Sequence, residues 1–227
     1  MRPIVGRMFE VGLGAEIIYS FVIIVCSLMV YYGTKELYNL SGYKGLKYFR
    51  QAFLFFAIAY FFRSFVKFIV VYFNLSRITD FFPRIFLGPV TLFLFMYFSS
   101  IAVFYLLYSV MWRKWEGNSK RIFLFHLLAL AIAAVSVWSG KFVVFLGLNI
   151  FLLAFIVLVV CIAYLRKRKK KNNLYAIYAL LLVFWVLNIF DILVPGFFKT
   201  FRLLIYMASS GIFLVILYKV LKKSGSG

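Results

Sequence analysis

The sequence predicts an all-α integral membrane protein of seven transmembrane helices, with the N-terminus outside and the C-terminus inside. Composition predicts the class, because 66% of the 227 residues are hydrophobic and only 14% are charged. A soluble globular chain is nearer half apolar and a quarter charged. The mean hydropathy of +1.02 agrees with a chain that lies in lipid. The spacing of the apolar runs and the placement of Lys and Arg predict the number and direction of the helices.

Seven apolar stretches are long enough to cross a membrane, because a helix needs about 20 apolar residues to span the hydrocarbon. In chain order they lie near residues 13–33, 48–73, 86–112, 121–139, 142–165, 174–195 and 201–221. They predict a single domain over residues 1–223, and the terminal Ser-Gly-Ser-Gly at 224–227 is typical of a linker. Because residues 1–14 hold no apolar run with a cleavage site, we expect no cleavable signal peptide.

Lys and Arg gather after the first, third, fifth and seventh stretches. Seventeen of the 26 lie on that side: Lys35, Lys44, Lys47, Arg50, Arg113, Lys114, Lys120, Arg121, Arg166 to Lys171, Lys219, Lys222 and Lys223. Seven lie on the other: Arg2, Arg7, Arg77, Arg84, Lys141, Lys199 and Arg202. Cytoplasmic loops carry the excess of Lys and Arg. The first helix therefore begins outside and the last ends inside, in a multi-pass protein of the plasma membrane.

The net charge of +20 does not predict a nucleic-acid partner, because the basic residues alternate with apolar runs instead of covering one soluble face. The run from Arg166 to Lys171 could attract anionic lipid headgroups, or it could serve only as a topology signal. No stretch is followed by a large soluble module, so any signal would pass to a separate cytoplasmic partner.

Two stretches suggest an internal 3+1+3 repeat. "SSIAVFYLLYSV" at Ser99–Val110 and "SSGIFLVILYKV" at Ser209–Val220 share Ser-Ser, Leu-Tyr and Val at equal spacing. Laying the second stretch on the sixth then places Arg63 on Asp191. Chance similarity between apolar sequences is the alternative.

The segment "GLKYFRQAFLFFAIAYFFR" at Gly45–Arg63 resembles small uncharacterised seven-helix membrane proteins of archaea. The resemblance covers mainly the first two stretches and implies a receptor-like or rhodopsin-like topology without an activity. The seventh stretch has "IYMASSGIF" at Ile205–Phe213, where a microbial rhodopsin needs a lysine for retinal. We therefore expect no retinal.

Ionisable residues inside a membrane are costly, so they are the first candidates for function. Arg63 and Lys67 are four residues apart and share a helix face with Tyr60. At a rise of about 1.5 Å per residue, Glu16 and Asp191 lie about 10 Å outside the midplane. The candidate site is a ligand-binding or ion-pair cluster in the outer half: Arg63, Lys67, Glu16, Asp191, Asn188, Tyr60 and Asn149.

The site allows three hypotheses. A receptor or sensor with a polar outer pocket would bind a small anionic or zwitterionic ligand at Arg63 and Lys67. A transporter or channel would use the same charges as a relay or gate. In a structural protein the charges would only pair helices, with Lys67 reaching the headgroups. Metal-ligand spacing and phosphate-binding loops are missing from the sequence, so we expect neither an enzyme nor a cofactor.

Overall fold

The fold is described from a computed structural model, which covers the backbone of residues 13–72, 84–115, 119–167, 174–194 and 199–224. Within these ranges the side chains of 13, 65–72, 84–87, 119, 166–167, 174, 199 and 223–224 lie outside the description. All regular structure in the described ranges is α-helical.

Seven of the described helices are 20 residues or longer and follow the predicted stretches closely. They are α2 (Leu13–Gly33), α4 (Lys44–Tyr72), α5 (Arg84–Trp115), α6 (Ser119–Ser139), α7 (Phe142–Lys167), α8 (Leu174–Leu193) and α9 (Lys199–Ser224). The sequence missed α3 (Lys35–Ser41), a helix of seven residues that ends at Gly42 in the left-handed conformation.

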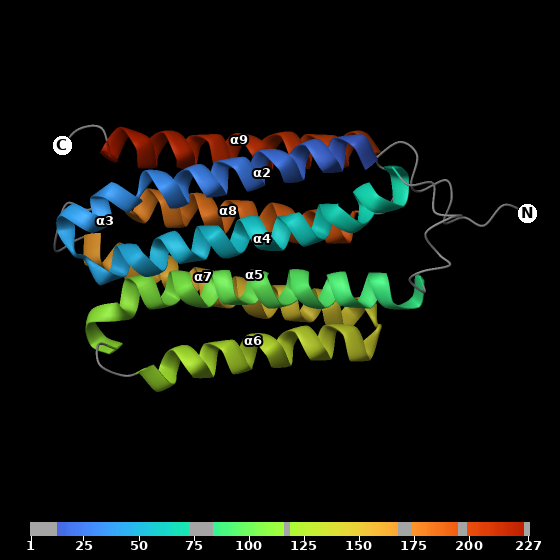
Figure 1. Ribbon diagram of the computed structural model, residues 1–227, viewed down its shortest axis with the longest axis horizontal. Helices are drawn as coiled ribbons and strands as arrows, with labels where there is room; N and C mark the ends of the chain where they lie inside the picture. The colour runs from blue at the N-terminus through green and yellow to red at the C-terminus, as the bar shows by residue number, and fades with distance from the viewer. Residues whose placement is uncertain (1–12, 73–83, 116–118, 168–173, 195–198, 225–227) are drawn as a thin grey trace, which may run out of the picture.

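The helices run side by side along one axis and alternate in direction (Figure 1). We call the end of the bundle where α2 begins the first end, and the end where α9 finishes the second end. Each long helix packs on the next one in the chain, α5 also packs on α7, and α9 returns to pack on α2. The first and last long helices are therefore neighbours, so residues far apart in sequence meet there.

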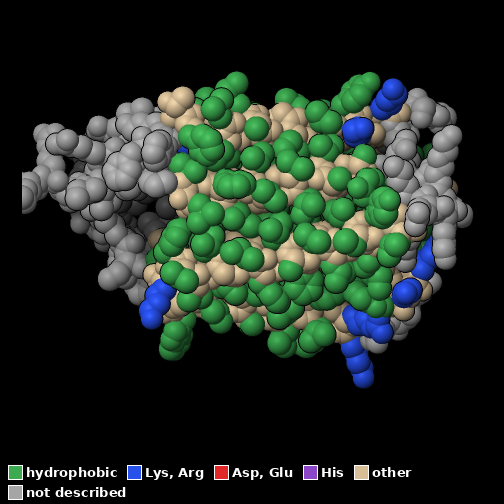
Figure 2. Space-filling model, turned by 180° about the vertical axis from the view of Figure 1, so that it is seen from behind, with side chains coloured by type: hydrophobic (Ala, Val, Ile, Leu, Met, Phe, Trp, Pro, Cys, Tyr) green, Lys and Arg blue, Asp and Glu red, His purple; other side chains and the backbone are tan. Residues whose placement is uncertain are grey.

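Six of these helices, α2 and α5 to α9, are long and apolar enough to cross a membrane by length and composition. The outer surface agrees with this, because large apolar side chains are exposed on it, such as Trp138 at 94% and Met207 at 71%. Figure 2 shows hydrophobic side chains over the middle of one face, with Lys and Arg towards its two ends. A soluble protein would not expose so broad an apolar surface to water. The described helices are thus consistent with a helical membrane protein.

Aromatic side chains fill much of the core between α4, α8 and α9. Phe53, Phe56 and Phe184 are buried and meet the ring of Phe213 at centroid distances of 6.3, 6.5 and 4.6 Å. Lipid tails are as apolar as these side chains, so close packing, and not removal from water, holds such helices together. Edge-on aromatic pairs add about 0.5–1.5 kcal/mol each.

Candidate functional site

Arg63 of α4 lies between two carboxylates from different helices, near the first end of the bundle. Its Nη2 donates to Oδ2 of Asp191 on α8 at 2.8 Å, and its Nε donates to Oε1 of Glu16 on α2 at 3.4 Å. The Arg63 side chain is 17% exposed, that of Glu16 11% and that of Asp191 9%. An arginine in a membrane requires such partners, because lipid offers none.

Asn188, one turn before Asp191 on α8, provides a shared acceptor. Its Oδ1 accepts from Tyr60 Oη at 2.8 Å and from Arg63 Nη1 at 3.2 Å. Its Nδ2 donates to the carbonyl of Phe184 at 2.9 Å, so the amide is held with its oxygen towards Arg63. The hydroxyl of Tyr19 on α2 lies 3.1 Å from that of Tyr60. It also lies 3.4 Å from Asn188 Oδ1, so the one Tyr19 proton has both Tyr60 and Asn188 as acceptors.

A second arginine, Arg202 at the start of α9, reaches the other side of the same Asp191. Its Nε lies 3.3 Å from Oδ1 of Asp191, an ion pair without hydrogen-bond geometry. Its Nη2 donates to the carbonyl of Val194 at 3.2 Å, and its side chain is 35% exposed. Charges of alternating sign thus connect four helices in the order Glu16, Arg63, Asp191 and Arg202. We call these four residues the Arg63 cluster.

Aromatic rings surround the Arg63 guanidinium. Its Cζ lies 5.6 Å from the ring centroid of Tyr60, 5.7 Å from that of Phe95 and 5.9 Å from that of Tyr19. Tyr206 of α9 stacks on Tyr19 at 4.6 Å. Rings at this distance attract a cation through their quadrupoles, by about 2 kcal/mol where water is excluded. The arginine is therefore held by both charge and ring contacts.

The structure brings together five of the seven predicted site residues. Arg63 donates to Glu16, Asp191 and Asn188, and Tyr60 donates to Asn188, so the five residues form one hydrogen-bonded network. The side chain of the sixth, Lys67, lies outside the described residues, although its backbone belongs to α4.

The seventh predicted residue, Asn149, lies apart on α7. Its Nδ2 donates to the Phe145 carbonyl at 2.9 Å, within its own helix. Its backbone carbonyl accepts from Trp185 Nε1 at 3.2 Å. Asn149 therefore contacts α8 one turn before Asn188 and nearly two turns before Asp191.

Three participants were missed by the sequence reasoning: Arg202, Tyr19 and Tyr206. Arg202 was treated only as a topology charge, because it is the second residue of the last predicted stretch, 201–221. A helix-face signal was available, since Tyr19 follows Glu16 by three residues and Tyr206 follows Arg202 by four.

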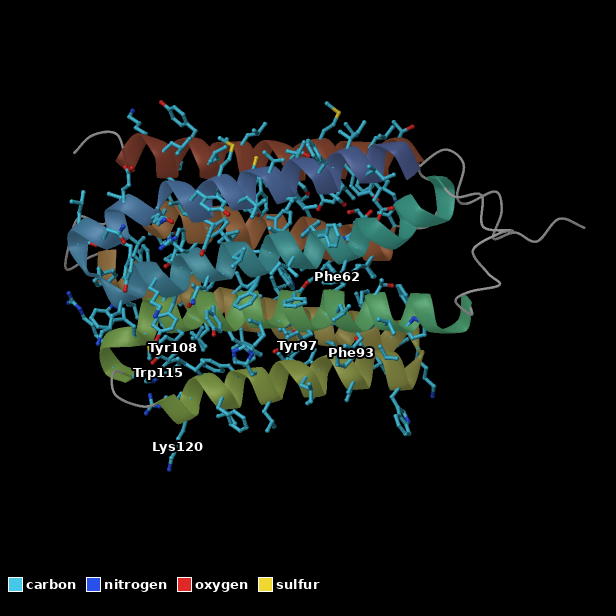
Figure 3. The ribbon with its side chains drawn as sticks, viewed as in Figure 1. Phe62, Phe93, Tyr97, Tyr108, Trp115 and Lys120 are labelled. Atoms are coloured by element: carbon cyan, nitrogen blue, oxygen red, sulfur yellow. The ribbon has the colours of Figure 1, made fainter. Side chains whose placement is uncertain are left out.

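Another polar contact joins α5 to α6. His126 of α6 lies between two tyrosines of α5, with Nδ1 2.9 Å from Tyr97 Oη and Nε2 3.2 Å from Tyr105 Oη. Figure 3 shows Tyr97 between α5 and α6. Because a neutral imidazole has one donor and one acceptor, one tyrosine donates to it and the other accepts. This histidine therefore connects α5 and α6.

Among the described residues, His, Cys, Asp and Glu form no group of three that could hold a metal ion. The site offers instead two guanidiniums, two carboxylates, an amide and phenolic hydroxyls. Such groups recognise charge and donate hydrogen bonds, and they can exchange one ionic partner for another.

Comparison with known proteins gives one informative relative. An uncharacterized protein of Archaeoglobus fulgidus is 32% identical over 219 residues, which cover 93% of this chain and 93% of that protein. No protein-family model matches the chain. Among solved structures there is no match either.

Proposed function

Since the chain belongs to the same family as the Archaeoglobus fulgidus protein, whose name states no activity, we propose a function from the Arg63 cluster itself. The protein is a receptor-like or sensor-like membrane protein that binds a small anionic or zwitterionic ligand at this cluster. Its role is binding and signalling without catalysis. The main support for this proposal is that Asp191 lies between two guanidiniums. Its Oδ2 lies 2.8 Å from Arg63 Nη2, and its Oδ1 lies 3.3 Å from Arg202 Nε.

In this proposal α4 is the seventh membrane-spanning helix. Its 29 residues are about 44 Å long at 1.5 Å per residue, which exceeds the hydrocarbon thickness. It packs between α2 and α5, both apolar enough to span. Lys44, Lys47 and Arg50 lie in its first two turns, at the second end, where a headgroup region tolerates charge.

The proposed orientation places the first end outside the cell membrane and the second end inside. The described basic residues of the second end are Lys35, Lys44, Lys47, Arg50, Arg113, Lys114, Lys120, Arg121, Lys219 and Lys222. Those of the first end are Arg63, Lys141 and Arg202. This difference supports a cytoplasmic second end, and a ligand would reach Arg202 from outside.

Asp191 acts in this proposal as an internal substitute for the ligand's anionic group. A buried ion pair is close to break-even, because desolvation of the two charges offsets most of their attraction. A ligand carboxylate can therefore replace Asp191 at the two arginines for little free energy. Release of Asp191 would free α8 from α4 and α9. The resulting movement of α8 would be transmitted to the second end, where a separate cytoplasmic partner would bind.

The test uses Asp191→Ala, which leaves Arg63 and Arg202 facing an unfilled carboxylate position. We expect acetate or formate to raise the thermal unfolding temperature of purified Asp191→Ala by several degrees more than that of wild type. Chloride at equal ionic strength should not do so. The matched control is Glu36→Ala, which removes a carboxylate at the second end and should show no acetate effect.

The structural hypothesis also has an observation in its favour: Arg63 is already paired with both carboxylates. If neither acetate nor formate stabilises Asp191→Ala, the cluster only ties helices together and the ligand proposal is wrong. The transporter hypothesis is tested separately in liposomes. Reproducible ion or solute flux that Asp191→Asn abolishes would replace the receptor proposal by transport.

A further inference from the structure

Two arginines beside the connection from α5 to α6 rest on aromatic rings. The Cζ of Arg113 lies 5.8 Å from the ring centroids of both Tyr43 and Trp112. The Cζ of Arg121 lies 5.3 Å from that of Trp115. A guanidinium on an aromatic face is pre-oriented, and its N–H groups stay available for a planar or tetrahedral anion.

Positive charge gathers around these two arginines. Lys114 and Lys120 are exposed beside them, and Lys47 is exposed near the start of α4. Among described residues at the second end, Glu36 on α3 is the one acidic side chain. This surface therefore attracts an anion.

The position of the surface selects the kind of anion. α5 ends at Trp115 and α6 begins at Ser119, so the arginines lie where two spanning helices leave the apolar layer. Figure 3 shows Tyr108, Trp115 and Lys120 near this end of α5 and α6. Trp and Tyr prefer the depth of the lipid headgroups. An arginine seated on those rings meets lipid phosphates at the same depth.

We propose that Arg113 and Arg121, with Lys114 and Lys120, form a binding site for the phosphate of an anionic phospholipid in the leaflet at the second end. Arginine donates two parallel hydrogen bonds to phosphate, which lysine cannot do. The sequence had suggested headgroup attraction at Arg166–Lys171, most of which lies outside the described residues. The ring-seated arginines place a defined site elsewhere, independent of the ligand proposed at the Arg63 cluster.

The experiment is native mass spectrometry of the full chain in a neutral detergent with phosphatidylglycerol or phosphatidylcholine. Wild type should retain phosphatidylglycerol in preference to phosphatidylcholine. Arg113→Gln/Arg121→Gln should bind phosphatidylglycerol about tenfold more weakly, as expected from the loss of charge-assisted hydrogen bonds. Unchanged binding by this variant would overturn the proposal.

Two further variants separate a defined site from general positive charge. Lys219→Gln/Lys222→Gln removes the same charge from exposed positions at the same end of α9, and its binding should stay within about twofold of wild type. Equal loss in both double variants would indicate diffuse attraction and reject the site. Arg113→Lys/Arg121→Lys keeps both positive charges, and it controls for misfolding of the glutamine variant. Full binding by this variant would reject the role of the ring-seated guanidiniums.

Discussion

Arg63 has more partners than a single ion pair provides. Two carboxylates, one amide oxygen and three aromatic rings lie around its guanidinium. Removing one member of a buried ion pair costs more than the pair contributes, because the partner is left charged and unpaired. Loss of Arg63 would leave two carboxylates, Glu16 and Asp191, without the cation that they share.

Arg63→Ala should therefore destabilise the protein strongly, by about 3–5 kcal/mol. Arg202→Ala should cost less, because the Arg202 side chain is 35% exposed and contacts one carboxylate. Equilibrium unfolding of both variants in mixed micelles measures the difference. A larger loss for Arg202→Ala would contradict the central place of Arg63.

At the scale of residues, the sequence predicted which acids meet Arg63 because helix rise and helix face are both set by spacing. Glu16 and Asp191 lay at the right height, and Tyr60 lay on the same helix face as Arg63. Asn149 also had the right height, but spacing does not determine which helices are neighbours, and α7 does not bring it to Arg63. Arg202 was missed because a charge near a helix start resembles a loop charge.

At the scale of elements, Gly45 of α4 lies directly against α5. A Cβ at that position would lie 2.8 Å from the carbonyl oxygen of Ser109 and 2.6 Å from the Trp112 ring. The oxygen belongs to the backbone of a helix and cannot move away alone. Gly45 thus allows the first turn of α4 to contact α5.

Gly45→Ala should force the two helices apart and destabilise the protein by about 1–3 kcal/mol, as overpacking does. Gly147→Ala on α7 is the matched control, because no atom lies within 4 Å of a Cβ there. It should leave stability unchanged or slightly raise it, since alanine favours helix. Thermal unfolding of the two variants side by side tests the close approach, and equal melting temperatures would argue against it.

The elements themselves were predictable because each apolar run is long and ends at polar residues. The first run, 13–33, has the bounds of α2, and the others differ by a few residues. α3 was missed because seven residues give too short a pattern for helical periodicity. The repeat between 99–110 and 209–220 stays a prediction, with Ser99 and Ser209 both buried in their helices.

At the scale of the whole molecule, the two ends of the bundle differ in chemistry. The first end has acids and bases in contact, and the second end carries mostly bases on an aromatic rim. Composition predicted the helical membrane class. The distribution of Lys and Arg between the loops predicted that the second end would be the more basic one. Which helices close the bundle could not be predicted, because the packing of α9 on α2 depends on side-chain fit and not on hydropathy.

Cysteine labelling tests the proposed orientation. Cys26 and Cys161 are first replaced by Ala, and a single cysteine is placed at Lys141 or at Lys222, both exposed and at opposite ends. A membrane-impermeant maleimide should label Lys141→Cys in intact cells, and Lys222→Cys only after permeabilisation. The reverse pattern would show that the second end is outside.

The order of the four charges along the chain has a consequence for biosynthesis. Glu16 and Arg63 belong to α2 and α4, the first two long helices, and Asp191 and Arg202 belong to α8 and α9, the last two. Each hairpin thus carries one acid and one base able to neutralise each other as it leaves the translocon. The contact of Arg63 with Asp191 joins the two hairpins only after both are in the bilayer. In the proposed seven-helix arrangement, these four charges can therefore enter the bilayer as two neutral pairs.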